Sequence, residues 1–118
     1  MATIETKPDL AGLRGKAAEA ARMLSLLANE NRLLVLCHLA VEGEMTVTAL
    51  AEAVGLSQPA LSQHLARLRE DGLVATRKRS QAVFYRLTDS TATTLLGVLR
   101  DLYCPPEANS TTKGIEPC

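Results

Sequence analysis

Two helix-start signals that lie close together, with one glycine between them, constrain the fold of this 118-residue chain more than any other feature. Thr46 precedes a short apolar-patterned segment that ends at Gly55. Ser57 precedes a second segment, with Pro59 in its first turn. Threonine and serine are good N-caps, glycine favours a helix end, and proline is tolerated in a first turn. A short helix, a glycine-containing turn and a second helix form a helix-turn-helix motif.

The second of these helices combines one apolar stripe with an unusual polar surface. Leu61, Leu65 and Leu68 recur at helical spacing and are predicted to be buried together. A helix face that only needs to be soluble usually presents Glu and Lys, whereas this one presents amides, hydroxyls and guanidiniums, which bind base edges and phosphates. Between a glycine turn and a basic segment, contact with DNA is a better interpretation than a solvated face. The predicted DNA contacts on this helix are Ser57, Gln58, Ser62, Gln63, His64 and Arg67.

The residue pattern changes after the Asp71 and Gly72 pair, from helical spacing to an alternation rich in β-forming residues. Residues 74–76 and 82–87 are predicted to be two strands, and the basic sequence "RKRSQ" between them is predicted to be the tip of a hairpin. A helix-turn-helix followed by a hairpin is a winged helix-turn-helix domain. The predicted fold class is therefore mainly α with a β-hairpin wing.

Charge is distributed unevenly in a chain whose 13 basic and 13 acidic residues sum to zero. Between residues 57 and 86 there are six basic and two acidic residues, which gives +4, so the rest of the chain carries −4. A local basic surface on a neutral protein indicates a polyanionic partner. The adjacent cations Arg77, Lys78 and Arg79 could simply make a hairpin soluble, but we predict that they contact phosphates of double-stranded DNA.

Three further helices are predicted, over residues 11–28, from the N-cap Asn29 to about residue 41, and from the N-cap Asp89 to the prolines at 105 and 106. Aromatic residues make up only 3% of the chain, so the core must consist of Leu, Val and Ala. The first and last helices have more apolar surface than a small core needs, which predicts a homodimer. The predicted interface residues are Leu13, Leu24, Leu95, Leu99 and Leu102.

The predicted organisation is a flexible N-terminus at residues 1–10, one DNA-binding and dimerisation domain at residues 11–104, and a flexible tail at residues 105–118. No stretch approaches the roughly 18 apolar residues that span a bilayer. The N-terminus lacks the basic start and apolar core of a signal peptide. A cytoplasmic protein without a membrane partner is expected.

The segment "LANENRLLVLCHLAVEGEMTVTALAEAVGLSQPALSQHLARLREDGLVATRKRSQAVFYRL" resembles the ArsR/SmtB family of bacterial winged-helix repressors. The similarity extends over about residues 16–104. It is carried by an "N-x-x-R-L-x-V-L" entry, an "S-Q-x-x-x-S-x-H-L" helix and a "Y-x-L" strand end. The resemblance implies a homodimer that blocks transcription until a small inducer binds, with no cofactor and no enzymatic activity.

The cysteines indicate which branch of the family the chain is similar to. Cys37 in "LCHLA" and Cys104 in "LYCP" resemble the thiol pair of the persulfide-sensing branch, in which two thiols react with sulfane sulfur and become bridged. The resemblance implies a repressor that responds to reactive sulfur species and releases genes for sulfide oxidation or detoxification. The metal-sensing branches match less well, because "TVTALAEAV" contains no Cys and "TATTLLGVLRDLYC" contains no His. Cys118 lies outside the pattern and has no assigned role.

Several alternatives remain open at this point. Free cysteines are often buried and only pack, so Cys37 and Cys104 could be structural. A metal-responsive repressor could use these two thiols and perhaps Cys118, although His38 and His64 are more typical of packed histidines than of metal ligands, and no metal site is predicted. A thiol-dependent enzyme would need a base and an oxyanion site. A protein-interaction module that has lost DNA binding conflicts with the basic wing.

Overall fold

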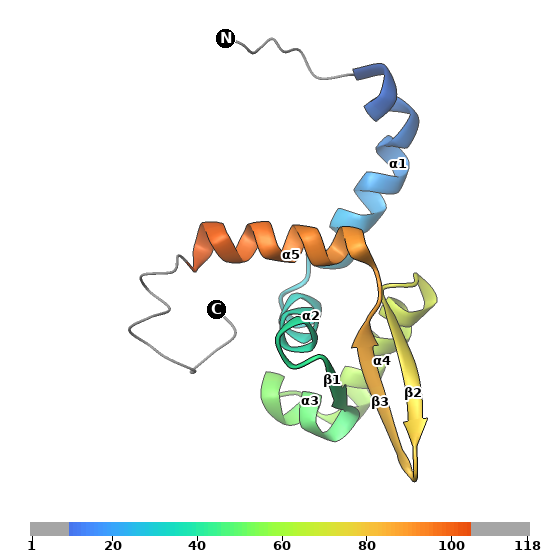
Figure 1. Cartoon of the computed structure of the whole chain (residues 1–118), viewed down its shortest axis with the longest axis vertical. Helices are drawn as coiled ribbons and strands as arrows, with labels where there is room; N and C mark the ends of the chain where they lie inside the picture. Colours follow the sequence, from blue (N-terminus) through green and yellow to red (C-terminus); the bar gives the residue numbers. More distant parts are fainter. Residues whose placement is uncertain (1–9, 105–118) are drawn as a thin grey trace.

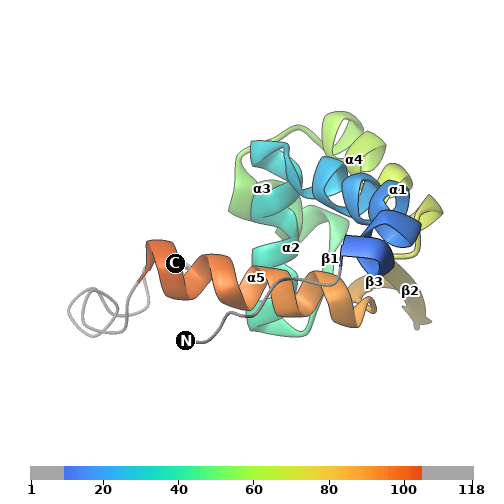
Figure 2. The same ribbon diagram turned by 90° about the horizontal axis from the view of Figure 1, so that it is seen from above.

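The computed structural model describes residues 10–104. Its elements are α1 (Leu10–Leu27), α2 (Glu30–Glu42), β1 (Glu44–Thr46), α3 (Val47–Val54), α4 (Gln58–Glu70), β2 (Val74–Arg79), β3 (Ala82–Leu87) and α5 (Ser90–Tyr103). Helices α2, α3 and α4 and the sheet form the body, while α5 crosses one end of it and α1 projects away (Figure 1). Seen from above, α4 and α5 lie on opposite sides of α2 (Figure 2). The predicted terminal segments 1–10 and 105–118 lie almost wholly outside the described residues.

Side-chain caps set the starts of four helices, as the sequence predicts. Each cap accepts a hydrogen bond from the backbone N–H three residues later, at 3.0, 3.2, 3.3 and 2.9 Å in chain order. These caps are Asn29, Thr46, Ser57 and Asp89. Gly55 ends α3 with a φ of 75°, which is a left-handed conformation that glycine adopts without a steric penalty. The helix-turn-helix of α3 and α4 is thereby confirmed.

The wing differs from the prediction in two ways. Strand β1 was not predicted; it pairs antiparallel with β3, so that the sheet has three strands in the order β1-β3-β2. Strand β2 continues through Arg79, which pairs with Ala82, and only Ser80 and Gln81 form the turn. The basic residues predicted at the hairpin tip therefore lie within a strand. Cross-strand hydrogen bonding extends the ladder through residues that have little β-propensity of their own.

The core confirms the predicted apolar stripe of α4. Leu61, Leu65 and Leu68 are at most 1% exposed and pack in one cluster with Val35 and Leu36 of α2. Burial of aliphatic side chains at this level is the main stabilisation available to a domain of this size. Helix α2 thus lies between α4 and α5 and is in contact with each of them.

Within residues 10–104, no single helix has the length and hydrophobicity of a membrane span; α1 and α2 reach that composition only as a pair bent by 89°.

Candidate DNA-binding surface and thiol pocket

Helix α4 exposes the side chains that the sequence assigned to base and phosphate contact. Gln58, Ser62, Gln63 and Arg67 are exposed, whereas His64 is half-buried beside the apolar stripe. The Gln58 side-chain amide donates a hydrogen bond to the Thr48 hydroxyl at 3.3 Å, which links the first turn of α4 to α3. This contact orients one amide group before any DNA is bound. The N-terminal half of α4 therefore presents a row of hydrogen-bonding groups on a rigid element, as recognition helices do.

The three basic residues of the wing are not equivalent in the structure. The Arg77 guanidinium donates two hydrogen bonds to the Glu44 carboxylate, at 2.9 and 2.7 Å, and so reaches from β2 to β1 across β3. The hydrogen bond from Arg77 holds the pKa of Glu44 below its usual value. Arg79 lies over the Phe84 ring, 5.7 Å from its centroid, whereas Lys78 has neither kind of contact with the residues that the structure describes. Phosphate contact by all three remains a prediction, and Lys78 is the most available of them.

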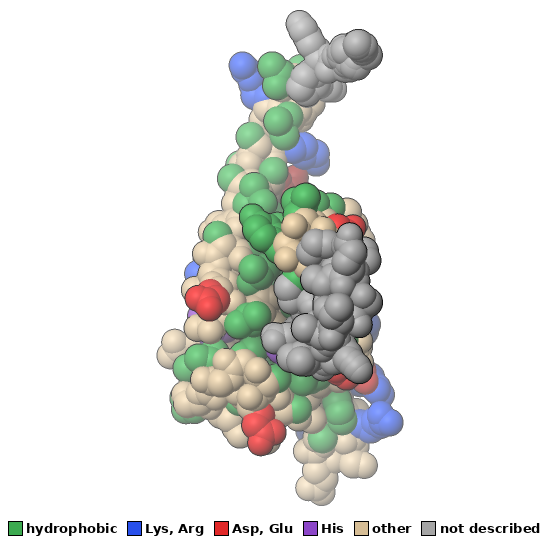
Figure 3. Space-filling view, turned by 90° about the vertical axis from the view of Figure 1, so that its left-hand side faces the viewer, with side chains coloured by type: hydrophobic (Ala, Val, Ile, Leu, Met, Phe, Trp, Pro, Cys, Tyr) green, Lys and Arg blue, Asp and Glu red, His purple; other side chains and the backbone are tan. Residues whose placement is uncertain are grey.

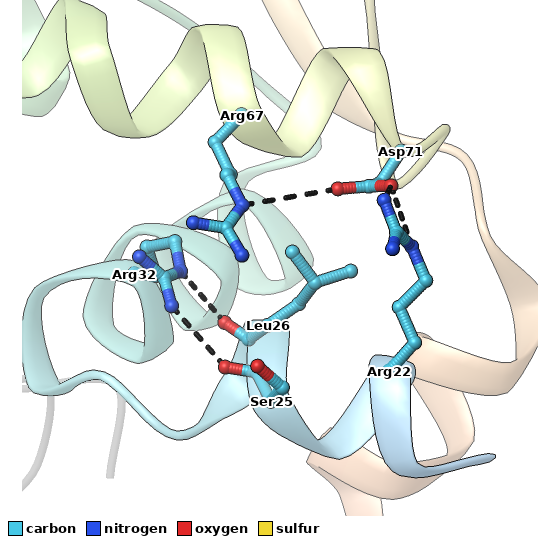
Figure 4. A network of polar contacts seen from close by, with 6 residues as sticks. All are labelled: Arg22, Ser25, Leu26, Arg32, Arg67 and Asp71. Carbon is cyan, nitrogen blue, oxygen red and sulfur yellow. Dashed lines mark hydrogen bonds and ion pairs between the residues drawn. The ribbon is translucent and has the colours of Figure 1, made fainter. Parts of the chain in front are cut away.

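A second ionic contact, which sequence reasoning missed, joins α1 to the C-terminal end of α4 (Figure 4). Asp71 accepts two hydrogen bonds from the Arg22 guanidinium, one of them at 2.9 Å from Nε, and its other oxygen lies 4.0 Å from Arg67 Nε. The Asp71 side chain is 11% exposed, against 70% for Arg22. The sequence identified Asp71 only as a helix end, because the 49 residues that separate it from Arg22 give no local signal of pairing.

Arg32 makes the neighbouring connection between α1 and α2. Its Nε donates to the backbone oxygen of Leu26 at 2.8 Å, and its terminal nitrogen donates to that of Ser25 at 3.2 Å (Figure 4). The last carbonyl groups of a helix have no partner within the helix, so this guanidinium supplies one and adds a favourable charge at that end. Arg22 and Arg32 together hold α1 against the body of the domain.

The two cysteines of the predicted pair line a single pocket between α2 and α5. Its volume is about 220 Å³. The other lining residues are Leu33, Leu34, Leu96, Leu99, Arg100 and Tyr103. Cys37 is half-buried and free, whereas Cys104 is 6% exposed and disulfide-bonded, so the two cysteines are not bridged to each other here. The fold thus brings the predicted sensing residues to one site.

The reactivity of Cys37 is controlled by two opposing effects. Burial raises the pKa of its thiol, because a thiolate loses hydration in an apolar wall, and the positive charge of Arg100 partly offsets this. The thiolate is the nucleophile, so its population near neutral pH is small.

The predicted dimer residues lie on α1 and α5 and form two groups. Leu13, Leu24 and Leu102 are 54, 56 and 69% exposed, whereas Leu95 and Leu99 are half-buried, and Leu95 packs against the core. Hydrophobic side chains run along the projecting α1 (Figure 3). Further exposed apolar residues on the same two helices, which the sequence prediction omitted, are Leu10, Val98 and Tyr103.

In the described part of the chain, no group of three or more His, Cys, Asp or Glu side chains could hold a metal ion. The metal-responsive alternative would therefore require ligands from beyond residues 10–104 or from a second chain. Cys118, which that alternative includes, lies outside the described residues.

Comparison with known proteins gives consistent matches. Residues 29–76 match the family described as bacterial regulatory protein, arsR family. The transcriptional activator HlyU of Vibrio cholerae is 45% identical over 96 residues, which cover 81% of this chain and 88% of that protein. The biofilm growth-associated repressor of Xylella fastidiosa is 39% identical and covers 87% of this chain and 91% of its own length. The crystal structure of the repressor BigR from Xylella fastidiosa has a TM-score of 0.76 at 39% identity, over 82% of this chain and 98% of that one.

Proposed function

This chain belongs to the ArsR family of bacterial regulatory proteins, and on that premise we propose that it is a homodimeric transcriptional repressor that releases its operator when Cys37 and Cys104 react with sulfane sulfur. Regulators of this family bind operator DNA and commonly act as dimers. The relatives named above are regulators of transcription rather than enzymes. The observation that carries the sensing proposal is the shared pocket, because the fold brings together two cysteines that are 67 positions apart in the chain.

The proposed DNA complex uses α4 and the wing. Helix α4 enters the major groove with Gln58, Ser62 and Gln63 towards base edges, and Arg67 and Lys78 contact phosphates. Two copies are needed to read two half-sites, and their separation is set by the dimer contact through α1 and α5. Any change in that contact alters the distance between the two α4 helices and therefore the affinity for the operator.

The proposed chemistry starts from the state in which both cysteines are reduced. The Cys37 thiolate attacks the outer sulfur of a hydropersulfide RS–SH, the new sulfur–sulfur bond replaces the RS–S bond, and RS⁻ leaves. The Cys104 thiolate then attacks the Cys37 sulfur of Cys37–S–SH, which forms the disulfide and expels HS⁻. If Cys104 has itself become Cys104–S–S⁻, the same attack gives a trisulfide. In each case the two cysteine sulfurs are oxidised and one sulfane sulfur is reduced to HS⁻; in the trisulfide a second sulfane sulfur remains as the central atom of the bridge.

A bridge of this kind would couple the pocket to the dimer contact. It joins α2, which packs against α4, to the end of α5, which carries Leu102 of the proposed interface. Couplings between two sites in one protein are typically about 1 to 3 kcal/mol, or roughly 5- to 150-fold in affinity. A change towards the upper end of that range lowers the occupancy of an operator substantially at fixed protein concentration.

The test is a DNA-binding titration of Cys37→Ser, Cys104→Ser and Cys118→Ser, each reduced and then treated with a persulfide donor. We expect all three to bind the operator when reduced, since none of these cysteines lies on α4 or the wing. Cys37→Ser and Cys104→Ser should stay bound after treatment, whereas Cys118→Ser should be released like the parent. Release of Cys37→Ser or Cys104→Ser would disprove the two-thiol switch, and loss of release in Cys118→Ser alone would move the sensor to the C-terminal segment.

A further inference from the structure

One charged residue lies among the otherwise uncharged residues that line the thiol pocket. Arg100, on α5, shares the pocket with four leucines, Tyr103 and the two cysteines. Apolar walls with one fixed charge favour a ligand that is itself apolar along its length and charged at one end. The pocket thus combines an apolar wall with one positive charge, which residues that only pack together would not need.

Within the described residues, the guanidinium of Arg100 has no ion pair or side-chain hydrogen bond. Arg22, Arg32 and Arg77 each hold a carboxylate or backbone oxygens of the domain through their guanidiniums. No such ion pair or side-chain hydrogen bond joins Arg100 to another residue between positions 10 and 104. Arginine matches anionic groups through several planar N–H donors, so an arginine beside the Cys37 thiol with no such partner in residues 10–104 is suited to bind an anion.

We propose that Arg100 is the specificity-determining residue of this pocket, and that it selects thiol-reactive molecules with an apolar body and an anionic end over neutral molecules of the same size. The proposal rests on the proposed function only in taking Cys37 as the thiol that reacts. Among sulfane sulfur donors, the class that fits is the linear hydropolysulfide anion, HSₙ⁻. Its chain of divalent sulfur is soft and apolar, and its charge lies at one end.

The charge balance of the reaction gives Arg100 a second role, in addition to binding the hydropolysulfide anion. When the Cys37 thiolate attacks the terminal sulfur of HS–Sₙ₋₁⁻, the new bond forms Cys37–S–SH and the bond to the remaining sulfur chain breaks. That chain leaves as Sₙ₋₁²⁻ and then takes a proton from water. Two negative charges thus approach each other in the encounter, and one of them grows on the leaving sulfur. The Arg100 guanidinium, which is exposed at the pocket, stabilises both stages by its positive charge.

Two alkylating reagents separate this selection from the general reactivity of the thiol. Iodoacetate and iodoacetamide have similar size and the same leaving group, but only iodoacetate is anionic. Any effect of Arg100 on the thiolate population changes both rates equally, so the ratio of the iodoacetate rate to the iodoacetamide rate reports on anion selection alone. The measurement uses the full chain with Cys104→Ser and Cys118→Ser, in which Cys37 is the one remaining thiol, and follows its alkylation by intact mass.

Arg100→Gln should lower this ratio about fivefold, the scale of one charge–charge contact of about 4 Å in water, because Arg100 is exposed. Arg100→Lys should retain most of the ratio, because it keeps the charge. Arg14→Gln is the matched control, since Arg14 lies on α1 and does not line the pocket, and it should leave the ratio unchanged. An unchanged ratio in Arg100→Gln would overturn the proposal.

A salt titration of the Cys37-only chain with Arg100 intact keeps the test valid even if Arg100→Gln does not fold. At about 1 M salt the screening length falls to about 3 Å, so the ratio of the iodoacetate rate to the iodoacetamide rate should fall. A ratio that does not fall as salt is added refutes the role of Arg100. These outcomes are independent of operator release. The sulfur-sensing proposal is disproved if persulfide donors do not release DNA from the parent protein, whatever the alkylation ratio. The anion-selection proposal is disproved by the alkylation ratio alone.

Discussion

At the scale of single residues, the polar groups of α4 and the wing should affect DNA binding in different ways. Gln63→Ala removes a group that can bond a base edge, so it should weaken operator binding by roughly 1 to 3 kcal/mol and leave non-specific binding nearly unchanged. Lys78→Gln removes a phosphate contact, so it should weaken both and reduce the salt slope by about one. Arg77→Gln is the comparison, since Glu44 already holds that guanidinium and the loss of affinity should be smaller.

Titrations of operator and random DNA at several salt concentrations check all three variants. Equal losses of specific and non-specific binding in Gln63→Ala would contradict its assignment to a base edge. A salt slope that falls as much in Arg77→Gln as in Lys78→Gln would show that DNA displaces Glu44 from Arg77.

At the scale of the elements, Arg22 on α1 should act mainly by neutralising the unfavourable charge of Asp71 at the end of α4. A carboxylate at a helix C-terminus is disfavoured by the helix dipole, and Arg22 and Arg67 offset this at Asp71. Arg22→Gln should therefore lower the free energy of unfolding by about 0.5 to 1 kcal/mol. Asp71→Asn should be nearly neutral, because the loss of the ion pair and the relief at the helix end oppose each other.

Denaturant unfolding of both single variants and the double variant gives the coupling between the two side chains. In the Asp71→Asn background, Arg22→Gln should no longer destabilise, because the carboxylate it neutralises is absent. Additive effects would mean that Arg22 stabilises the domain through other contacts.

At the scale of the whole molecule, the exposed apolar residues of α1 and α5 should form the subunit contact. Leu102 is 69% exposed in the single chain, so Leu102→Glu leaves the core intact but places a charge at the proposed interface. Sedimentation should then show a folded monomer, with weaker operator binding because the two half-sites are no longer linked. Val41→Glu, at an exposed position of α2 outside this interface, should remain dimeric. A dimeric Leu102→Glu would place the contact elsewhere.

Features encoded within a few residues could be predicted from the sequence. The caps Asn29, Thr46, Ser57 and Asp89 and the spacing of Leu61, Leu65 and Leu68 depend on interactions within one or two turns, and the structure confirms them. The contact residues of α4 follow from the same logic, since a helix with one buried stripe must present its other side chains outward. Their role in binding DNA stays a prediction.

Features that join distant segments were decided by the tertiary structure. Strand β1 exists because β3 supplies its hydrogen-bond partners, and β2 extends to Arg79 for the same reason. The pairs Arg77–Glu44 and Arg22–Asp71, and the placing of Arg100 beside Cys37, depend on how elements pack. Local patterns specify which face of a helix or strand is apolar, but the packing of those faces determines which charges and thiols meet, because each such contact joins residues whose separation along the chain leaves no periodic signal.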